Sequence, residues 1–530
     1  MHHLIIAMHF IFFSGISCNK AVTPEKEEIK TEIVSTTIAD LRKSNVRGNV
    51  IYRTTDNGGG DWTYDAMDAT SEDNTGTVLL TESGQRVKRI SQGPLNVKWF
   101  GAKGDSISDE TDAFNKALAA AKSQKQSLYI PAGIYSCNKA DKDNHILVLD
   151  AGSLDNITIS GDGVKSKITT SSKASTLLLY IYAYSKNHNL KIRDLAFESV
   201  HPVMTNYSHG IMLQGTKGEN FVNTEITGCG FEGFSTTIIG QGLNGIEISN
   251  NQFNAPLGHD NAQNNSSPAV YIWFFDDNNG FCSDIKIINN LANGYSGSEP
   301  IGTLSSKRPM DGFIYGTGYG YLVSGNKTKY FSEEHIVIAP QTTDRATTRK
   351  IVISNNELDG SIPTGAKNQN GSMHSSNYAI RCDASHSSIT DNSINNFTIG
   401  IMVRTFDYPA IRGEDINISG NTLVSQINQP NCKVSKGISV QGSVKNRLRK
   451  IIIENNKITV ANVRTGNNFS GIAVIDTDSA DVRNNQIDVS DLISEKKENN
   501  FGISYGRVNA ILDTGNLIKN ITPHNVIVLP

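Results

Sequence analysis

The chain has 530 residues, which is long enough for several ordinary domains or for one long solenoid. Hydrophobic residues make up 38% of it, aromatic residues 7%, and 46 residues are glycine, a composition that favours a thin, regular core with many turns. The net charge is −3, so no overall positive field supports a nucleic-acid partner, and we expect none. An anionic ligand would have to be held by a local cluster of basic side chains.

Residues 1–17 have the character of a secretory signal peptide. Leu4 to Phe13 is an apolar stretch too short to cross a membrane, although no Lys or Arg precedes it. Small residues then precede Cys18, which resembles the lipidated cysteine of a bacterial lipobox, but Gly15 stands where leucine is usual. We expect a secreted protein held at the outer membrane or cell surface only by lipid on Cys18, with simple secretion as the alternative.

The five other cysteines are predicted to be small core residues and not a disulfide framework. Their spacing contains no C-x-x-C pair and no zinc-binding pattern. Cysteine outside a disulfide packs as a small apolar side chain. The five are Cys137, Cys229, Cys282, Cys382 and Cys432.

Two polar regions precede the part of the chain with regular patterning. Residues 18–45 are rich in charge and are predicted to form a flexible tether behind the lipobox. Residues 46–92 are rich in Gly, Asp and Thr, and we expect a small, loosely structured lead-in or cap there. Residues 93–530 are predicted to form one domain.

The first patterned element is a helix, predicted from about Thr111 to Ser123. Apolar residues at helical spacing give it one buried face, and Asp109 or Thr111 itself is suited to capping its N-terminus. Such a helix would close the open end of a stacked structure, as terminal repeats require. The apolar face comprises Ala113, Phe114, Ala117, Leu118 and Ala121.

Three motifs around this helix carry a family resemblance. They are VKWFGAKGD at 97–105, DETDAF at 109–114 and LYIPAGIY at 128–135. This succession resembles the opening of the pectate-lyase-like superfamily of right-handed parallel β-helices, in which such a stretch caps the stack and begins the first coil. The superfamily includes polysaccharide lyases, glycoside hydrolases, epimerases and phage tailspikes, so the resemblance implies the fold and leaves the activity open.

The rest of the chain is repetitive. A regularly spaced series of nine pairs, each Asn, Asp or Gly followed by asparagine, runs from Asn250-Asn251 to Gly515-Asn516 in steps of 29 to 39 residues. The runs between these pairs are three to five residues long and alternate apolar with polar residues, which suits strands. We therefore predict an all-β fold, a right-handed parallel β-helix with three short strands per coil and a ladder of corner asparagines.

The first strand of each coil is expected to carry the ligand on its outer face, as in the β-helix enzymes that the sequence resembles. Aligning six of these strands on their apolar residues separates inward positions, such as Ile211, Ile272 and Ile336, from outward ones. The outward residues are Met212, Gln214, Tyr271, Trp273, Val337, Ala339, Arg381, Asp383, Met402, Arg404, Ser439 and Gln441.

Four of these outward residues suit an acidic sugar chain. Tyr271 and Trp273 are predicted to stack on sugar rings. Arg381 and Arg404 fall on adjacent coils, where two guanidiniums repel each other unless an anion lies between them. Asp383 and Asp407 could supply that anion, or a carboxylate or sulfate of the substrate could take the place.

Long insertions precede three of the first strands and are expected to wall one side of a cleft. They cover residues 258–267, 297–310 and 363–377. The second insertion contains Lys307 and Arg308, which we expect to bind the substrate.

Two histidines are candidate proton carriers. His335 lies in a first strand and His374 in the third insertion, and imidazole titrates near neutral pH. The alternative for His335 is that it only fills a strand edge. Asp276 and Asp277 could bind Ca²⁺, although two adjacent carboxylates are weak evidence for a metal site. No other cofactor is expected, and we expect a monomer.

These residues favour β-elimination over hydrolysis. A lyase must neutralise the carboxylate of a uronic acid, for which Arg381 or Arg404 is suited, and then move protons, for which His335 is suited. A hydrolase needs paired carboxylates, and the sequence shows no clean pair. We predict a lyase for a uronic-acid polysaccharide such as a glycosaminoglycan, pectin or alginate. A glycoside hydrolase and a non-catalytic surface glycan-binding protein are the alternatives.

Overall fold

The computed structural model describes residues 31–521 apart from fourteen internal segments. These segments are 173–175, 201–207, 216–220, 256–258, 261–269, 276–281, 296–306, 309, 341–347, 362–375, 406–412, 427–432, 462–463 and 491–499. In the part of the chain thus described, no helix has the length and apolar character needed to cross a membrane.

The first folded unit is a small sheet packed on one helix. Its elements are β1 (Glu32–Thr36), α1 (Ile38–Lys43), β2 (Val50–Thr54), β3 (Gly60–Tyr64), β4 (Val78–Leu80) and β5 (Arg86–Ile90), in the sheet order β1-β2-β3-β5-β4. Only β1 and β2 are parallel. The core consists of Ile38, Leu41, Val46, Val50, Tyr52, Trp62, Leu79 and Val87.

This unit corrects the predicted organisation of the N-terminal region. The tether was predicted to reach residue 45 and the lead-in at 46–92 to be loosely structured, but the sheet begins at Glu32 and continues to Ile90. The polar composition of this region did not predict a fold, because its few apolar residues are far apart in sequence and contact one another only across the sheet. Arg89 joins this unit to the rest, since its guanidinium lies 4.3 Å from the Trp62 ring and 4.8 Å from the Trp99 ring.

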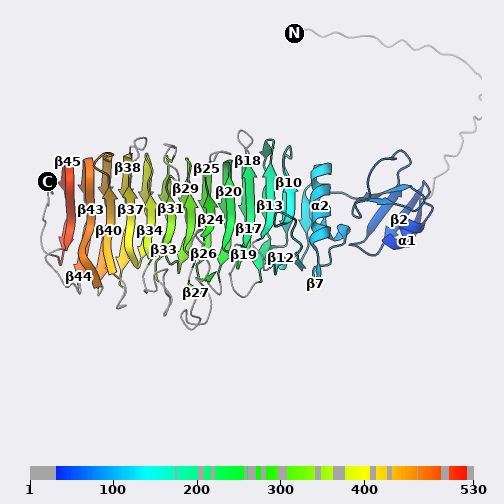
Figure 1. Cartoon of the computed structure of the whole chain (residues 1–530), viewed down its shortest axis with the longest axis horizontal. Coiled ribbons are helices and arrows are strands. Elements are labelled where there is room, and N and C mark those ends of the chain that lie inside the picture. The colour runs from blue at the N-terminus through cyan, green and yellow to red at the C-terminus, as the bar shows by residue number, and fades with distance from the viewer. Residues whose placement is uncertain are drawn as a thin grey trace, which may run out of the picture.

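The predicted capping helix is present as α2 (Thr111–Gln124). Asp109 Oδ1 accepts hydrogen bonds from Thr111 N (3.0 Å) and Thr111 Oγ1 (2.6 Å), next to the start of the helix. Glu110 Oε1 accepts from the backbone of Lys103 (2.9 Å), which ties the motif at 97–105 to the helix. The predicted face, from Phe114 to Ala121, is buried against the first coils and closes the end of the stack (Figure 1).

Beyond α2 the chain forms a right-handed parallel β-helix, as predicted, with three strands per coil (Figure 1). The first strands are β10 (His145–Asp150), β13 (Leu177–Ala183), β17 (His209–Gly215), β20 (Thr236–Gln241), β24 (Val270–Phe274), β28 (Gly312–Gly316), β31 (Glu334–Ile338), β34 (Ser376–Cys382), β37 (Phe397–Arg404) and β40 (Lys433–Gln441).

The second strands continue the same large sheet around a corner. They are β6 (Leu95–Asn96), β8 (Leu128–Ile130), β11 (Thr158–Gly161), β14 (Asn187–His188), β15 (Lys191–Arg193), β18 (Phe221–Thr227), β21 (Leu243–Ser249), β25 (Ser283–Ile288), β29 (Leu322–Ser324), β32 (Val352–Ser354), β35 (Ser387–Thr390), β38 (Glu414–Ser419) and β41 (Arg449–Glu454). In the last two coils β43 (Arg464–Arg483) and β45 (Phe501–Thr514) run through both positions.

The third strands form a separate parallel sheet. They are β7 (Asp105–Asp109), β9 (Gly133–Ser136), β12 (Ser166–Thr170), β16 (Ala196–Ser199), β19 (Gly230–Glu232), β22 (Gln252–Asn254), β26 (Leu291–Asn293), β30 (Lys327–Lys329), β33 (Glu357–Asp359), β36 (Ser393–Asn395), β39 (Thr422–Ser425), β42 (Lys457–Ala461), β44 (Gln486–Ser490) and β46 (Leu517–Lys519). The remaining short elements are η1 (Val97–Phe100), η2 (Gly163–Lys165), β23 (His259–Asp260) and β27 (Lys307–Arg308).

The corner asparagines form the predicted ladder, and the two residues of each pair have different structural roles. The first residue has a left-handed backbone, with φ between 54° and 69° in all nine pairs. The second residue points its amide inward, so that its Oδ1 accepts from the backbone and side-chain amides of the asparagine one coil before. For Asn326 and Asn356 these two distances are both 3.0 Å. The ladder comprises Asn251, Asn290, Asn326, Asn356, Asn392, Asn421, Asn456, Asn485 and Asn516.

Replacing Asn356 with alanine is expected to lower the free energy of unfolding by about 2–3 kcal/mol, because buried amides above and below lose their partners. Asn356 also donates to Val323 O (3.0 Å) and Asn392 Oδ1 (2.9 Å). Urea unfolding followed by circular dichroism measures the change. Asn417→Ala, on the outer side of β38, is the matched control and should cost no more than about 0.5 kcal/mol. Equal losses in the two variants would mean that the ladder adds nothing specific.

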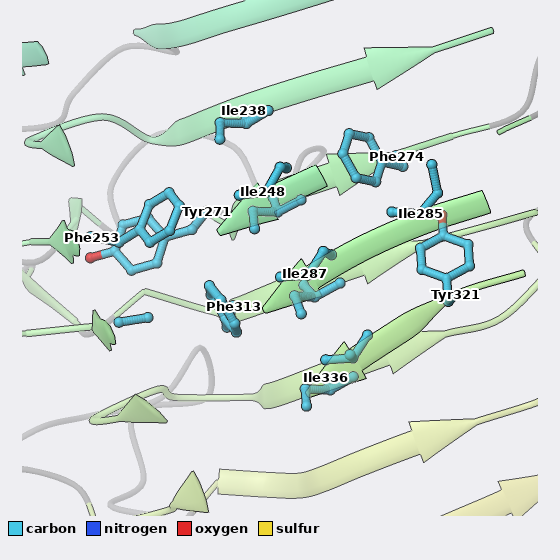
Figure 2. Packing of buried hydrophobic residues seen from close by; sticks show 14 of the residues in the cluster. Ile238, Ile248, Phe253, Tyr271, Phe274, Ile285, Ile287, Phe313, Tyr321 and Ile336 are labelled. Carbon is cyan, nitrogen blue, oxygen red and sulfur yellow. The ribbon is translucent and has the colours of Figure 1, made fainter. Parts of the chain in front are cut away.

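The interior is filled by columns of stacked apolar side chains (Figure 2). In the sheet of third strands, Phe197, Phe231 and Phe253 stack on one another, with ring centres 5.3 and 5.1 Å apart. The column then narrows, because the next two inward positions are Ala292 and Thr328. The described cysteines Cys137, Cys229, Cys282 and Cys382 are buried in this interior, as predicted, whereas Cys18 and Cys432 lie outside the described residues.

Candidate functional site

Two rows of outward side chains run along the first strands, from coil to coil. Hydrogen-bonded register places Trp273, Tyr315, Val337 and Arg381 at equivalent positions of β24, β28, β31 and β34. The second row lies two residues further along each strand and includes Asp383. The predicted inward residues of these strands are buried in the core: Ile211, Leu213, Val270, Ile272, Ile336, Ile338, Ile401 and Val403.

Tyr271 is an exception to the predicted alternation. It was predicted to face outward with Trp273, but it is only 1% exposed and its ring packs 5.3 Å from the Phe253 ring. Its hydroxyl donates to the carbonyl of Asn293. Tyr271 and Ile272 are both buried, so the backbone bends at this point of β24, and Figure 2 shows Tyr271 beside Phe253. Tyr271 therefore fills the room beside Ala292 and cannot stack on a sugar.

His335 is buried for the same reason, which makes its predicted role as a proton carrier wrong. It occupies the equivalent bend of β31, has no exposed surface, and its Nδ1 lies 2.6 Å from Thr328 Oγ1. Burial lowers the pKa of His335 to about 4. In other coils a glycine occupies this bend, because the facing residue of the third strand is larger. At Gly400, for example, a Cβ would come within 2.4 Å of the Leu423 side chain. Aligning the bend positions would have revealed the pattern in the sequence.

The burial of His335 predicts a loss of stability on acidification. The unfolded-state pKa is near 6.5 and the folded value about 4, so the folded state binds fewer protons between these values. The contribution of His335 is fully present above pH 6.5 and is lost as pH falls towards 4, by roughly 3 kcal/mol in total. We expect His335→Gln, which does not titrate, to lose correspondingly less stability than the wild type between pH 7.5 and 4.5 in urea unfolding. Parallel losses would contradict a neutral, buried imidazole.

Arg381 and Arg404 lie on adjacent strands, and Asp383 lies between them. Asp383 Oδ2 contacts Arg381 Nε at 2.8 Å and Arg404 Nε at 3.3 Å, while its Oδ1 accepts from the backbone N–H of Arg404 at 3.2 Å. The side chain of Asp383 is only 1% exposed, whereas those of the arginines are 18% and 28% exposed. Burial raises the pKa of Asp383, and the two guanidiniums oppose this effect. The protein thus supplies the anion that its arginine pair requires.

Glu334 and Tyr315 complete the cluster, and the sequence analysis missed both. Glu334 Oε1 lies 3.8 Å from Arg381 Nη1, and Tyr315 donates a hydrogen bond to the Glu334 carboxylate. Burial raises the pKa of Glu334, although Arg381 and the tyrosine hydrogen bond lower it. Burial also raises the pKa of Tyr315 well above its ordinary value, so this phenol stays protonated. A signal existed, because Glu334 directly precedes His335 and Tyr315 continues the outward row of Trp273.

Several predicted site residues are not part of this cluster. His374, Asp276 and Asp277 lie outside the described residues, as does Cys18. The backbone of Lys307 and Arg308 forms β27, which pairs with β23 through antiparallel partners His259–Arg308 and Asp260–Lys307. Two of the predicted insertions therefore meet each other in a two-stranded ladder. Trp273 faces outward and is partly exposed, as predicted.

One group of side chains in the described part of the chain has suitable ligand types for a metal ion. It comprises His386, Glu414 and Asp415, on a corner of the second strands. His386 Nδ1 lies 3.0 Å from Asp415 Oδ2, but Lys450 Nζ lies 3.1 Å from Asp415 Oδ1 and competes with a cation. His386 follows Asp383 by three residues, beyond the corner that separates the first strands from the second.

The cluster combines three chemical capacities. Its guanidiniums can bind a carboxylate or sulfate. Glu334, whose pKa is raised by burial, is suited to exchanging a proton with a ligand. Tyr315 is suited to donating one.

Both folded units match a known family model over part or all of their length. Residues 34–92 match the family model described as a phage tail protein small four-stranded β-sheet domain. Residues 95–299 match the model described as rhamnogalacturonase A/epimerase, pectate lyase-like.

Solved structures that are similar to this chain share little sequence with it. The Dettilon tailspike protein (gp208) is 14% identical, with a TM-score of 0.53, over 77% of this chain and 70% of that one. The A-module of the mannuronan C-5 epimerase AlgE6 from Azotobacter vinelandii is 16% identical, with a TM-score of 0.47, over 81% of this chain and 100% of that one. PfbA, a surface adhesin of Streptococcus pneumoniae, is 12% identical, with a TM-score of 0.47, over 79% and 91%. The family model thus places residues 95–299 in the pectate-lyase-like superfamily, and the coils that follow continue the same parallel β-helix.

Proposed function

We propose that this protein is a polysaccharide lyase that cleaves a uronic-acid polymer by β-elimination at the cluster formed by Tyr315, Glu334, Arg381, Asp383 and Arg404. The observation that carries the proposal is the pair of partly exposed guanidiniums fixed by a buried aspartate beside a hydrogen-bonded Tyr–Glu pair. This arrangement supplies an anion-binding site and two groups that exchange protons within one cluster.

The proposed reaction moves one proton from the sugar ring to the leaving group. Arg381 and Arg404 bind the uronate carboxylate and stabilise the negative charge that develops when C5 loses its proton. The Glu334 carboxylate takes that proton. The electrons of the broken C–H bond form the C4–C5 double bond, and the C4–O bond breaks.

Tyr315 protonates the departing oxygen and then recovers a proton from Glu334 along the hydrogen bond between them. The protein thereby returns to its starting state, and the products are an unsaturated uronyl end and a new reducing end. The histidine first considered for proton transfer has no place in this scheme, because it is buried.

The accessibility of the carboxyl groups favours elimination over hydrolysis. Glu334 and Asp383 both lie beside the Arg381 guanidinium, at 3.8 and 2.8 Å. Their two carboxyl groups are therefore no further apart than the acid pairs of glycosidases, which are separated by roughly 5–9.5 Å. This spacing is the observation that supports a glycoside hydrolase as the second candidate. However, Asp383 is 1% exposed and both of its oxygens are engaged, so it is poorly placed to attack a sugar or activate water.

We further propose an extracellular setting. The apolar stretch Leu4–Phe13 and the small residues before Cys18 support export and a lipid anchor. The enzyme would act there as a monomer on polysaccharide outside the cell.

Ultraviolet absorbance tests the proposal and names the substrate. Purified protein is incubated with chondroitin sulfate, polygalacturonate and alginate, each with and without Ca²⁺. A rise in absorbance from the unsaturated uronyl product is expected with one of them. New reducing ends without that absorbance would assign hydrolysis, and binding without either product would assign a glycan-binding protein.

A further inference from the structure

A strip of aromatic rings crosses the outer face of the β-helix near its N-terminal end. It consists of Tyr180 and Tyr182 on β13, Tyr184 just beyond that strand, and His145 on β10. Ring centres are 4.1 Å apart for His145 and Tyr180, 5.4 Å for Tyr180 and Tyr182, and 4.9 Å for Tyr182 and Tyr184. The rings therefore form one continuous surface and not isolated exposed aromatics.

The strip is accessible and has polar edges. Tyr184 is 65% exposed, and Tyr180 and Tyr182 are partly exposed. The Tyr180 hydroxyl donates to Gln214 Oε1 at 2.6 Å, which fixes this ring from the next coil. Partly exposed tyrosines with apolar faces and polar tips suit sugar rings, which also present apolar faces and hydroxyl edges.

The same two outward rows connect this strip to the candidate catalytic cluster. Tyr180 pairs in register with Met212, which continues the row through Ile239 to Trp273 and on to Arg381. Between β13 and β34 there are six strand spacings. At about 4.8 Å per spacing, the strip lies roughly 29 Å from the arginine pair along the axis of the β-helix.

A second aromatic pair lies midway along this path. The rings of Trp273 and Phe275 are 5.5 Å apart, three strand spacings from Tyr180, and both are partly exposed. Trp273 Nε1 is buried and has no acceptor among the described residues. A buried indole N–H without an acceptor is costly unless a ligand supplies one, as a sugar hydroxyl would.

We propose that the Tyr180–Tyr182–Tyr184 strip is a remote sugar-binding platform, and that the substrate chain extends from the arginine cluster over the Trp273–Phe275 pair towards the N-terminal cap. This inference rests on the proposed function, because it takes the same polysaccharide as the ligand. It adds that the substrate is a long chain bound along the axis. An oligosaccharide too short to span roughly 29 Å cannot reach both ends of the path.

The double variant Tyr182→Ala/Tyr184→Ala tests the platform. Binding of intact chondroitin sulfate, polygalacturonate and alginate is measured by affinity electrophoresis, and cleavage of the bound polymer is compared with cleavage of its tetrasaccharide. The double variant should bind the polymer about tenfold more weakly. Its ratio of polymer to tetrasaccharide kcat/KM should fall by a similar factor. Tyr129→Ala is the matched control, since Tyr129 is a partly exposed tyrosine of the neighbouring second strands, and it should leave both quantities unchanged.

The possible results separate this inference from the function on which it rests. Polymer binding that stays at the wild-type level in the double variant would overturn the platform and leave the proposed lyase intact. Equal losses on polymer and tetrasaccharide would also overturn it, because the rings would then act near the reaction centre or on the fold. Failure of the wild type to bind or cleave any of the three polymers would overturn both proposals.

Discussion

Glu334→Gln is expected to reduce kcat/KM on the cleaved polysaccharide by about 10²- to 10⁴-fold, the usual range for loss of a general acid or base. Glutamine keeps the size of the side chain and an oxygen that accepts from Tyr315, but it cannot take a proton. Because glutamine has nearly the same shape and Glu334 lies 3.8 Å from Arg381 Nη1, beyond hydrogen-bond distance, the change should leave the fold intact. Initial rates by ultraviolet absorbance and urea unfolding of the same preparation measure the two effects.

The pH dependence of the wild type provides the complementary evidence. Elimination requires Glu334 to be ionised, and burial raises its pKa above the ordinary 4.5, although Arg381 and the Tyr315 hydrogen bond oppose the shift. The rate should therefore rise with pH through an acidic limb that lies above 4.5. Glu333→Gln, one residue earlier, is the matched control and should retain the wild-type rate and limb. If Glu334→Gln keeps full activity, the assignment of the base is wrong.

Asp383→Asn is expected to lower the free energy of unfolding by about 3–5 kcal/mol and to abolish activity. The substitution leaves Arg381 and Arg404 facing each other without the buried negative charge that holds them. Their guanidiniums would repel and move apart, so the carboxylate-binding geometry would be lost together with stability. Urea unfolding and the absorbance assay measure the two outcomes.

A second carboxylate that bridges two arginines serves as the control for Asp383. Asp478 contacts Arg447 Nε at 2.8 Å and Arg449 Nε at 3.1 Å, but its side chain is 32% exposed. Because water and salt screen an exposed pair, Asp478→Asn should cost no more than about 1 kcal/mol and leave the rate unchanged. Comparable destabilisation by the two substitutions would show that burial of Asp383 is not what makes it important.

The features that repeat in the sequence could be predicted from it. The asparagine spacing predicted the ladder, because each corner places one amide at the same position of every coil. Period-two alternation likewise predicted that Arg381 and Arg404 are outward neighbours. Both predictions depend only on periodicity and register, which local sequence specifies.

The features that depend on packing between coils could not be predicted in this way. Tyr271 and His335 point inward because the chain bends at the start of their strands. The small residues Ala292 and Thr328, which are paired in the sheet of third strands, leave the space that the two rings fill. Alternation within one strand contains no information about either cause. Glu334 was missed for the same reason, since the bend places it on the outer face beside Arg381. The N-terminal sheet was missed because its core residues are distant in sequence.

Elimination is tested most directly by counting both kinds of chain end that the wild-type protein produces from the polysaccharide it cleaves. Elimination creates one unsaturated uronyl end for every new reducing end. The mechanism through Glu334 and Tyr315 therefore predicts equal numbers of the two ends throughout the reaction. Reducing ends that accumulate without unsaturated ends would contradict it, because the cluster would then be hydrolysing the glycosidic bond.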